Sequence, residues 1–73
     1  MNGERVVGTV KFFRADRGFG FLLVGAEEIF VTGTRLQSAR IDPTRLKPGD
    51  RLSFEIDRDE RGRPRAARIE MVP

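Results

Sequence analysis

Hydrophobic and polar side chains alternate in short runs along this chain, and turn-forming residues separate the runs. Leu52, Phe54 and Ile56 alternate with Ser53 and Glu55, which is the period-two pattern of a half-buried β-strand. The other runs are rich in β-branched and aromatic residues, which favour strands. The pattern predicts five short strands, at residues 6–13, 18–24, 29–32 and 52–56, with a last strand that opens at Pro64.

The alternation fails inside the first predicted strand. Lys11, Phe12 and Phe13 follow one another, so the two adjacent rings cannot both lie on the face that period two would assign them. A β-bulge or a bend in the strand would resolve the conflict. We therefore expect Phe12 to face outward and Phe13 to face mostly inward.

The third connection, residues 33–47, is long and has no sustained periodicity. Pro43 and Pro48 interrupt any helix there, so at most one short helical turn fits, at residues 34–38. Five short strands with a long third connection are typical of a small all-β barrel, the five-stranded antiparallel OB-fold. Closing the barrel also removes exposed strand edges. We expect residues 1–73 to form one such domain.

Alternate residues of each predicted strand face inward and supply the core of this barrel. The expected core residues are Val6, Val10, Leu22, Ile29, Val31, Leu52, Phe54, Ile56 and Ile69. In the last strand, Ala67 and Met71 are expected to face inward together with Ile69. The remaining large apolar side chains, chiefly phenylalanines, are left for the outer face.

Composition excludes several classes of function. The chain has no cysteine and no histidine, which removes disulfides, thiol catalysis and the usual zinc sites. The acidic residues Asp57, Asp59 and Glu60 match no calcium-loop spacing and are interpreted as a solvated turn. We expect no enzyme, no cofactor, no small-molecule substrate and no membrane span, and we expect a cytoplasmic monomer. The net charge of +3 is too small to indicate a nucleic-acid partner by itself. Any such indication must come from where the cations lie in the sequence.

Residues 11–22 combine rings and cations more closely than a buried strand would. Four of the six phenylalanines lie in this stretch. Period two places Phe19 and Phe21 on one face, while Gly18 and Gly20 leave the opposite face thin. With Phe12 and Phe30, these rings predict an outer aromatic surface for stacking bases, and neighbouring cations for phosphate contact. The cations are Lys11, Arg14 and Arg17, although Arg17 is also placed to pair with Asp16.

Residues 8–13, 17–22 and 29–31, in this order and spacing, resemble the cold-shock domain family, and residues 48–54 and 66–69 resemble its last two strands. The resemblance implies a protein that binds single-stranded RNA or DNA. It also implies roles as an RNA chaperone or as a regulator of transcription or translation. The residues expected at the binding surface are Lys11, Phe12, Arg14, Arg17, Phe19, Phe21, Phe30, Thr32 and Arg35.

The chain departs from the family pattern at several of these positions. Phe12 replaces the usual tryptophan, Arg14 the usual asparagine, Thr32 a histidine and Gly33 a ring, and residues 33–47 contain no aromatic residue. Arg35 and Arg40 are candidates to compensate through guanidinium stacking and charge, although each taken singly is interpreted as a solvated loop arginine. The departures also support an alternative hypothesis, a barrel that serves as a protein-interaction module and binds nucleic acid weakly.

Arginines are frequent in the connection between the last two strands. Gly62, Arg63 and Pro64, flanked by Arg61 and Arg65, resemble the core of an AT-hook, an element that binds the minor groove of DNA. Such a hook works as a disordered tail, whereas this segment joins two strands. We therefore interpret it as a hairpin turn whose arginines add diffuse attraction to phosphate.

Overall fold

The computed structural model describes residues 5–72, so residues 1–4 and 73 of the predicted domain lie outside the described part. Within it, five strands, one short helix and one 3₁₀ turn follow each other along the chain. They are β1 (Arg5–Arg14), β2 (Phe19–Val24), β3 (Glu27–Thr32), α1 (Gly33–Ser38), η1 (Pro43–Arg45), β4 (Arg51–Arg58) and β5 (Pro64–Met71). The helical turn predicted for residues 34–38 is confirmed as α1.

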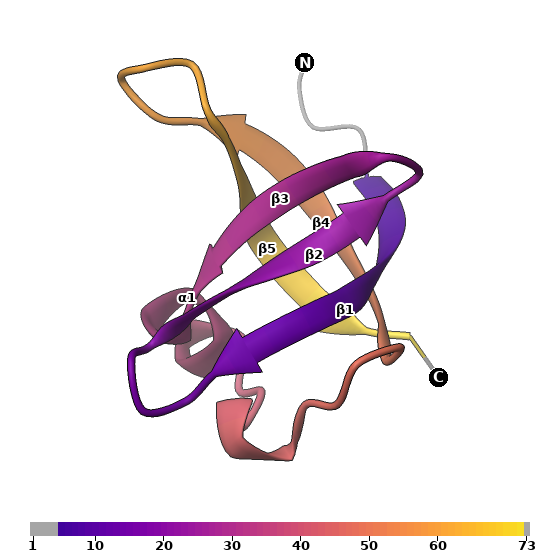
Figure 1. The fold of residues 1–73 in the computed structure, drawn as a ribbon, viewed down its shortest axis with the longest axis vertical. Helices are drawn as coiled ribbons and strands as arrows, with labels where there is room; N and C mark the ends of the chain where they lie inside the picture. Colours follow the sequence, from indigo (N-terminus) through magenta and orange to yellow (C-terminus); the bar gives the residue numbers. More distant parts are fainter. Residues whose placement is uncertain (1–4, 73) are drawn as a thin grey trace.

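The strands close into a barrel in the order β1-β2-β3-β5-β4. The prediction of a small all-β OB-fold barrel is therefore confirmed. Four of the strand pairs are antiparallel, and the barrel closes through a parallel contact of β3 with β5, where Phe30 pairs with Arg65. In Figure 1 the β1–β2–β3 meander forms one side of the barrel and the β4–β5 hairpin extends from the other.

The irregularity predicted for β1 is present. The register between β1 and β2 shifts between Val10 and Phe12, so Lys11 lies in a bulge. After the bulge Phe12 faces outward and Phe13 packs against the core, as expected. Gly20 of β2 lies directly against this segment, and a Cβ atom at Gly20 would stand 2.7 Å from the Cα of Phe13. Glycine is needed here because two backbones approach each other closely.

The core fills the barrel with side chains from all five strands and from α1. The fully buried ones with the largest volumes are Phe54, Leu22, Ile29, Leu36, Leu52 and Val31. The inward position predicted for Met71 is wrong, because its side chain is 51% exposed. At this end of the barrel β5 pairs with β4 alone, and β3 does not reach far enough to cover Met71. A second bulge lies in β5, where Arg68 and Ile69 together oppose Phe54 of β4, and Arg68 has a φ of 50°.

Helix α1 begins where β3 ends and covers one end of the barrel (Figure 1). The side chain of Thr32 caps the helix by accepting a hydrogen bond from the backbone N–H of Arg35 at 3.3 Å. Leu36 is the buried residue of the helix and joins the core. Arg40 follows with a φ of 63°, a left-handed conformation common after a helix C-terminus. The connection is thus anchored by a cap and a core leucine, without any aromatic residue.

Candidate nucleic-acid interface

The outer face of β1, β2 and β3 carries a cluster of four phenylalanines, Phe12, Phe19, Phe21 and Phe30, here called the ring surface. All four side chains are half-buried. The ring centroids of Phe12 and Phe21 are 5.7 Å apart, and Phe30 lies 5.6 Å from Phe21 and 6.0 Å from Phe19. The rings meet in tilted or edge-to-face geometry, which is the favourable arrangement for aromatic pairs. The surface is therefore assembled without a ligand.

Strand register explains why these rings meet. Phe12 pairs with Phe21, Phe21 with Phe30, and Phe30 with Arg65, so one row of cross-strand neighbours runs over four strands. Side chains opposite each other in a sheet lie about 4.5–5.5 Å apart at Cβ and therefore touch. A second row begins with Arg14, which pairs with Phe19. The bulge at Lys11 brings Phe12 into the first row, because without it the parity of β1 would be reversed from this point on.

The three predicted cations are exposed and border the ring surface, but two of them are engaged. Lys11 forms an ion pair with Glu28 across to β3, and Arg14 pairs with Asp16 at 3.6 Å. The alternative pairing of Arg17 with Asp16 does not occur, and Arg17 has no ion-pair partner among residues 5–72. Exposed ion pairs of this kind are weak, about 0–1 kcal/mol, so a phosphate can replace the carboxylate.

Thr32 and Arg35 lie beside the ring surface in different ways. Thr32 pairs with Phe19 across β2 and β3, but its hydroxyl caps α1. Arg35 is half-buried and lines a small recess together with Phe30 and Arg65. The structure therefore places both predicted residues at the edge of the ring surface. The other arginine considered for compensation, Arg40, is exposed after α1 and lines none of the recesses described here.

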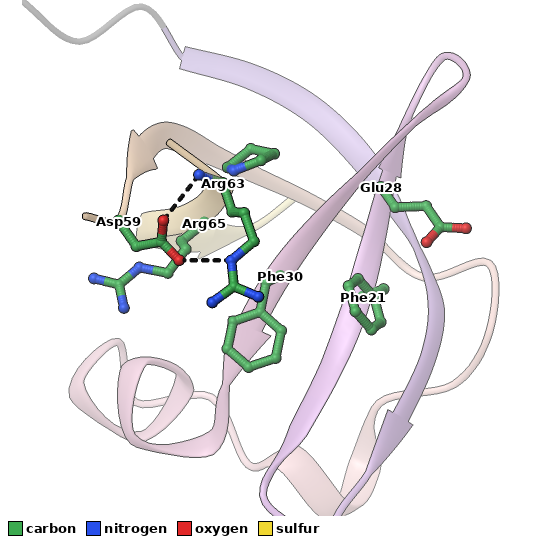
Figure 2. A pocket seen from close by; sticks show the side chains of 7 residues that line it. Phe21, Glu28, Phe30, Asp59, Arg63 and Arg65 are labelled. Carbon is green, nitrogen blue, oxygen red and sulfur yellow. Dashed lines mark hydrogen bonds and ion pairs between the residues drawn. The ribbon is translucent and has the colours of Figure 1, made fainter. Parts of the chain in front are cut away.

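Next to the ring surface is a cleft of about 400 Å³ that the sequence analysis did not predict. It lies between β2–β3 and the β4–β5 hairpin, and Figure 2 shows the side chains around it. The lining residues are Phe21, Glu28, Phe30, Asp59, Arg63, Pro64 and Arg65. The hairpin arginines were expected to add only diffuse charge. No signal in the sequence pointed to this cleft, because its two sides come from segments that only the closed barrel brings together.

The hairpin turn that carries these arginines is folded around the carboxylate of Asp59. Its Oδ1 accepts hydrogen bonds from the backbone N–H groups of Arg61 at 2.9 Å and Arg63 at 2.8 Å. Its Oδ2 accepts one from Nε of Arg63 at 3.0 Å. These bonds, that of the Arg63 backbone first, lower the pKa of Asp59 below its ordinary value. The carboxylate is therefore ionised at neutral pH and holds the turn in one conformation.

Two kinds of feature are absent from the described part of the chain. Residues 5–72 contain no group of three acidic or other metal-binding side chains placed to hold an ion. None of the helices in this range is long and apolar enough to cross a membrane. What the barrel presents is an aromatic surface on the β1–β3 face with cations around it, a combination that defines an OB-fold protein of the nucleic-acid-binding class.

Comparison with known proteins identifies the family within this class. The model of the 'Cold-shock' DNA-binding domain matches residues 6–72. The chain belongs to the cold-shock domain family, so the resemblance seen in the sequence is confirmed. This is a family of nucleic-acid-binding proteins and not of enzymes.

Curated relatives agree with this assignment. Cold shock-like protein CspG of Escherichia coli (strain K12) is 36% identical over 68 residues, which cover 90% of this chain and 93% of that protein. Cold shock-like protein CspB of Bacillus cereus is 38% identical over 63 residues, covering 85% of this chain and 92% of that protein. Cold shock domain-containing protein 4 of Arabidopsis thaliana is 32% identical over 69 residues, covering 92% of this chain but 33% of that longer protein.

Proposed function

We propose that this protein binds single-stranded RNA or DNA by stacking unpaired bases on the ring surface. The observation that carries the proposal is the cross-strand row of rings on the outside of a barrel whose core is already filled by the opposite parity. One exposed ring needs no explanation, whereas four in contact form a patch that points to a partner. Each stacked base contributes about 1–3 kcal/mol to binding.

Phosphates are contacted by the cations at the edge of the ring surface. Arg17 is available directly, while Lys11 and Arg14 exchange Glu28 and Asp16 for phosphate oxygens. If about four phosphates are neutralised, a plot of log affinity against log salt concentration has a slope of about −3. An affinity that does not depend on salt would refute these phosphate contacts.

Stacking is tolerant of sequence because every base has a π-face. A protein that holds unpaired bases in this way stabilises the single-stranded state over the duplex. The physiological activity proposed is therefore melting of RNA structure, as an RNA chaperone, with regulation of transcription or translation as its consequence. The barrel acts as a monomer in this proposal.

The proposal is tested by fluorescence anisotropy with a labelled oligopyrimidine. Phe19→Ala/Phe30→Ala removes two stacking partners and should weaken binding by at least about thirtyfold. Val7→Ala is the matched control, because Val7 is an exposed apolar residue of β1, 55% exposed and outside the ring surface. Thermal melting followed by circular dichroism establishes that the double variant is folded.

Two outcomes would contradict the proposal. A folded double variant that binds as tightly as the wild type would exclude stacking by these rings. A wild-type protein that binds no oligonucleotide would favour the competing function, a protein-interaction module. The observation that supports this alternative is that Thr32 and Gly33, where the family offers rings, are used here to begin α1.

A further inference from the structure

The cleft beside the ring surface has an apolar floor and charged groups at both ends. Phe21, Phe30 and Pro64 supply the apolar contacts, Arg63 lies on the hairpin side, and Glu28 lies on the β3 side (Figure 2). Its volume of about 400 Å³ lies within the range of small-ligand sites, roughly 300–1,000 Å³. An inorganic anion or a phosphate would gain nothing from the apolar floor and would be repelled by the carboxylate. A flat nucleobase fits the cleft better, because its face can pack on the apolar floor and its polar edges can bond to the charged groups at the two ends.

Arg63 is held in place before any ligand arrives. Asp59 binds its Nε and its backbone N–H, and the backbone N–H of Asp59 donates to the carbonyl oxygen of Arg63 at 3.0 Å. Neither terminal nitrogen of the guanidinium has a partner among residues 5–72. Figure 2 shows this end of the side chain directed toward Phe30. The two terminal nitrogens form a fixed fork of donors above the aromatic floor.

Arg65 also lines this end of the cleft, but its Nε is buried and therefore out of reach of a ligand. The two terminal nitrogens of Arg63 remain as donors for a ligand at this end. The hairpin end of the cleft therefore selects a ligand edge with two acceptors.

The opposite end offers an acceptor. Lys11 contacts Oε2 of Glu28, and the other carboxylate oxygen accepts no hydrogen bond from residues 5–72. A carboxylate can accept two parallel N–H bonds from a ligand. The β3 end of the cleft therefore selects an edge with donors.

We propose that this cleft is a base subsite that prefers guanine, an inference that rests on the nucleic-acid binding proposed above. Guanine presents two acceptors, O6 and N7, to the Arg63 fork, the commonest specific pairing of arginine with a base. Its N1–H and N2–H₂ donors face Glu28, and its ring lies on Phe30. The other bases fit less well. Uracil and cytosine each have one donor group on the edge that would face Glu28, where guanine has two. Adenine has its N6 amino donor at the position where the two terminal nitrogens of Arg63 need an acceptor.

The test compares a labelled uridine heptamer with a set of heptamers in which one uridine, at each position in turn, is replaced by guanosine. The best guanosine heptamer should bind the wild-type protein about tenfold more tightly than the uridine heptamer. The same substitution with 7-deazaguanosine, which lacks N7, and with inosine, which lacks the N2 amine, should each remove most of this gain. Cytidine and adenosine at the same position should give no gain.

Protein variants test which residue contacts which edge of the guanine base. Arg63→Lys keeps the charge but loses the fork, so the guanosine preference should fall below about threefold and 7-deazaguanosine should then equal guanosine. Glu28→Gln should make inosine equal to guanosine. Arg61→Lys is the matched control, because Arg61 lies in the same turn but does not line the cleft, and it should retain the full preference.

The outcomes separate this inference from the proposed function. If the wild type binds the uridine heptamer and gains nothing from guanosine at any position, or prefers cytidine, the guanine subsite is refuted while the binding function stands. A guanosine preference that survives Arg63→Lys would also refute it. If no heptamer binds at all, both the function and the subsite are refuted.

Discussion

Replacing Gly20 by alanine tests whether the close approach of two strands supports the ring surface. Gly20 is buried in β2 and pairs with Phe13 of β1 and with Val31 of β3. The added Cβ atom would stand 2.7 Å from both Cα and Cδ1 of Phe13, and closer still to the carbonyl oxygen of Phe12. Backbone atoms cannot turn away as a flexible side chain can. The strands must therefore move apart next to the bulge that directs Phe12 outward.

The size of the effect follows from overpacking. Inserting a methyl group into a close-packed site costs typically 1–3 kcal/mol, and a clash with backbone lies at the upper end, so we expect a loss of about 3 kcal/mol. For a domain of this size this corresponds to a fall in Tm of roughly 12–24 °C. Displacement of Phe12 should also remove one stacked base, and the affinity for an oligopyrimidine should fall by about tenfold.

The assay is thermal and urea unfolding followed by far-ultraviolet circular dichroism, since the chain contains no tryptophan or tyrosine. The matched control is Gly33→Ala in α1. The nearest neighbours of a Cβ atom at Gly33 would be the carbonyl oxygen of Gly18 at 3.6 Å and, at 3.7 Å, the Cα of Gly18 and the ring of Phe13, which is ordinary contact. This variant should be as stable as the wild type or more stable by about 0.5 kcal/mol. If Gly20→Ala melts within about 2 °C of the wild type, the close-approach reasoning is wrong.

Three further predictions concern single side chains around the site. Glu28→Gln frees Lys11 from an ion pair that phosphate must otherwise displace, so oligopyrimidine binding should tighten; an unchanged affinity would show that Lys11 reaches no phosphate. Thr32→Ala removes the cap of α1 and should cost about 1 kcal/mol in urea unfolding, whereas Thr32→Ser should not; equal losses would exclude the hydroxyl as the cap. Because hydrogen bonds lower the pKa of Asp59 in the folded protein, the stability it provides is complete above about pH 4 and is lost as the pH falls through the lowered value. The stability difference between wild type and Asp59→Asn should therefore shrink in acid, and a difference that stays constant down to about pH 2 would contradict this.

Much of the ring surface could be predicted from local sequence. The side-chain period of a strand is two, so the positions of Phe19 and Phe21 on one face required no knowledge of other strands. The failure of alternation at Lys11 indicated the bulge, which the register confirms. Local reasoning was wrong for Met71, because burial at the end of a strand depends on whether a neighbouring strand covers it.

The charged partners of the site could not be predicted in this way. Asp16 was placed beside Arg17 by sequence, yet it pairs with Arg14, because the turn at residues 15–18 folds back on the end of β1. Glu28 reaches Lys11 only through the alignment of β1, β2 and β3. The role of Thr32 as the cap of α1 was likewise not predicted, because it depends on where the helix begins after β3.

The sequence by itself determined the five strands, the outward parity of the rings and the family, since each depends on residue spacing within a short segment. Only the tertiary structure decided that the arginines of the β4–β5 hairpin stand beside Phe30. That neighbourhood exists because β3 and β5, distant in the chain, pair in parallel when the barrel closes. Contacts that barrel closure creates leave no periodic signal in either segment, which is why the cleft became visible only in the folded molecule.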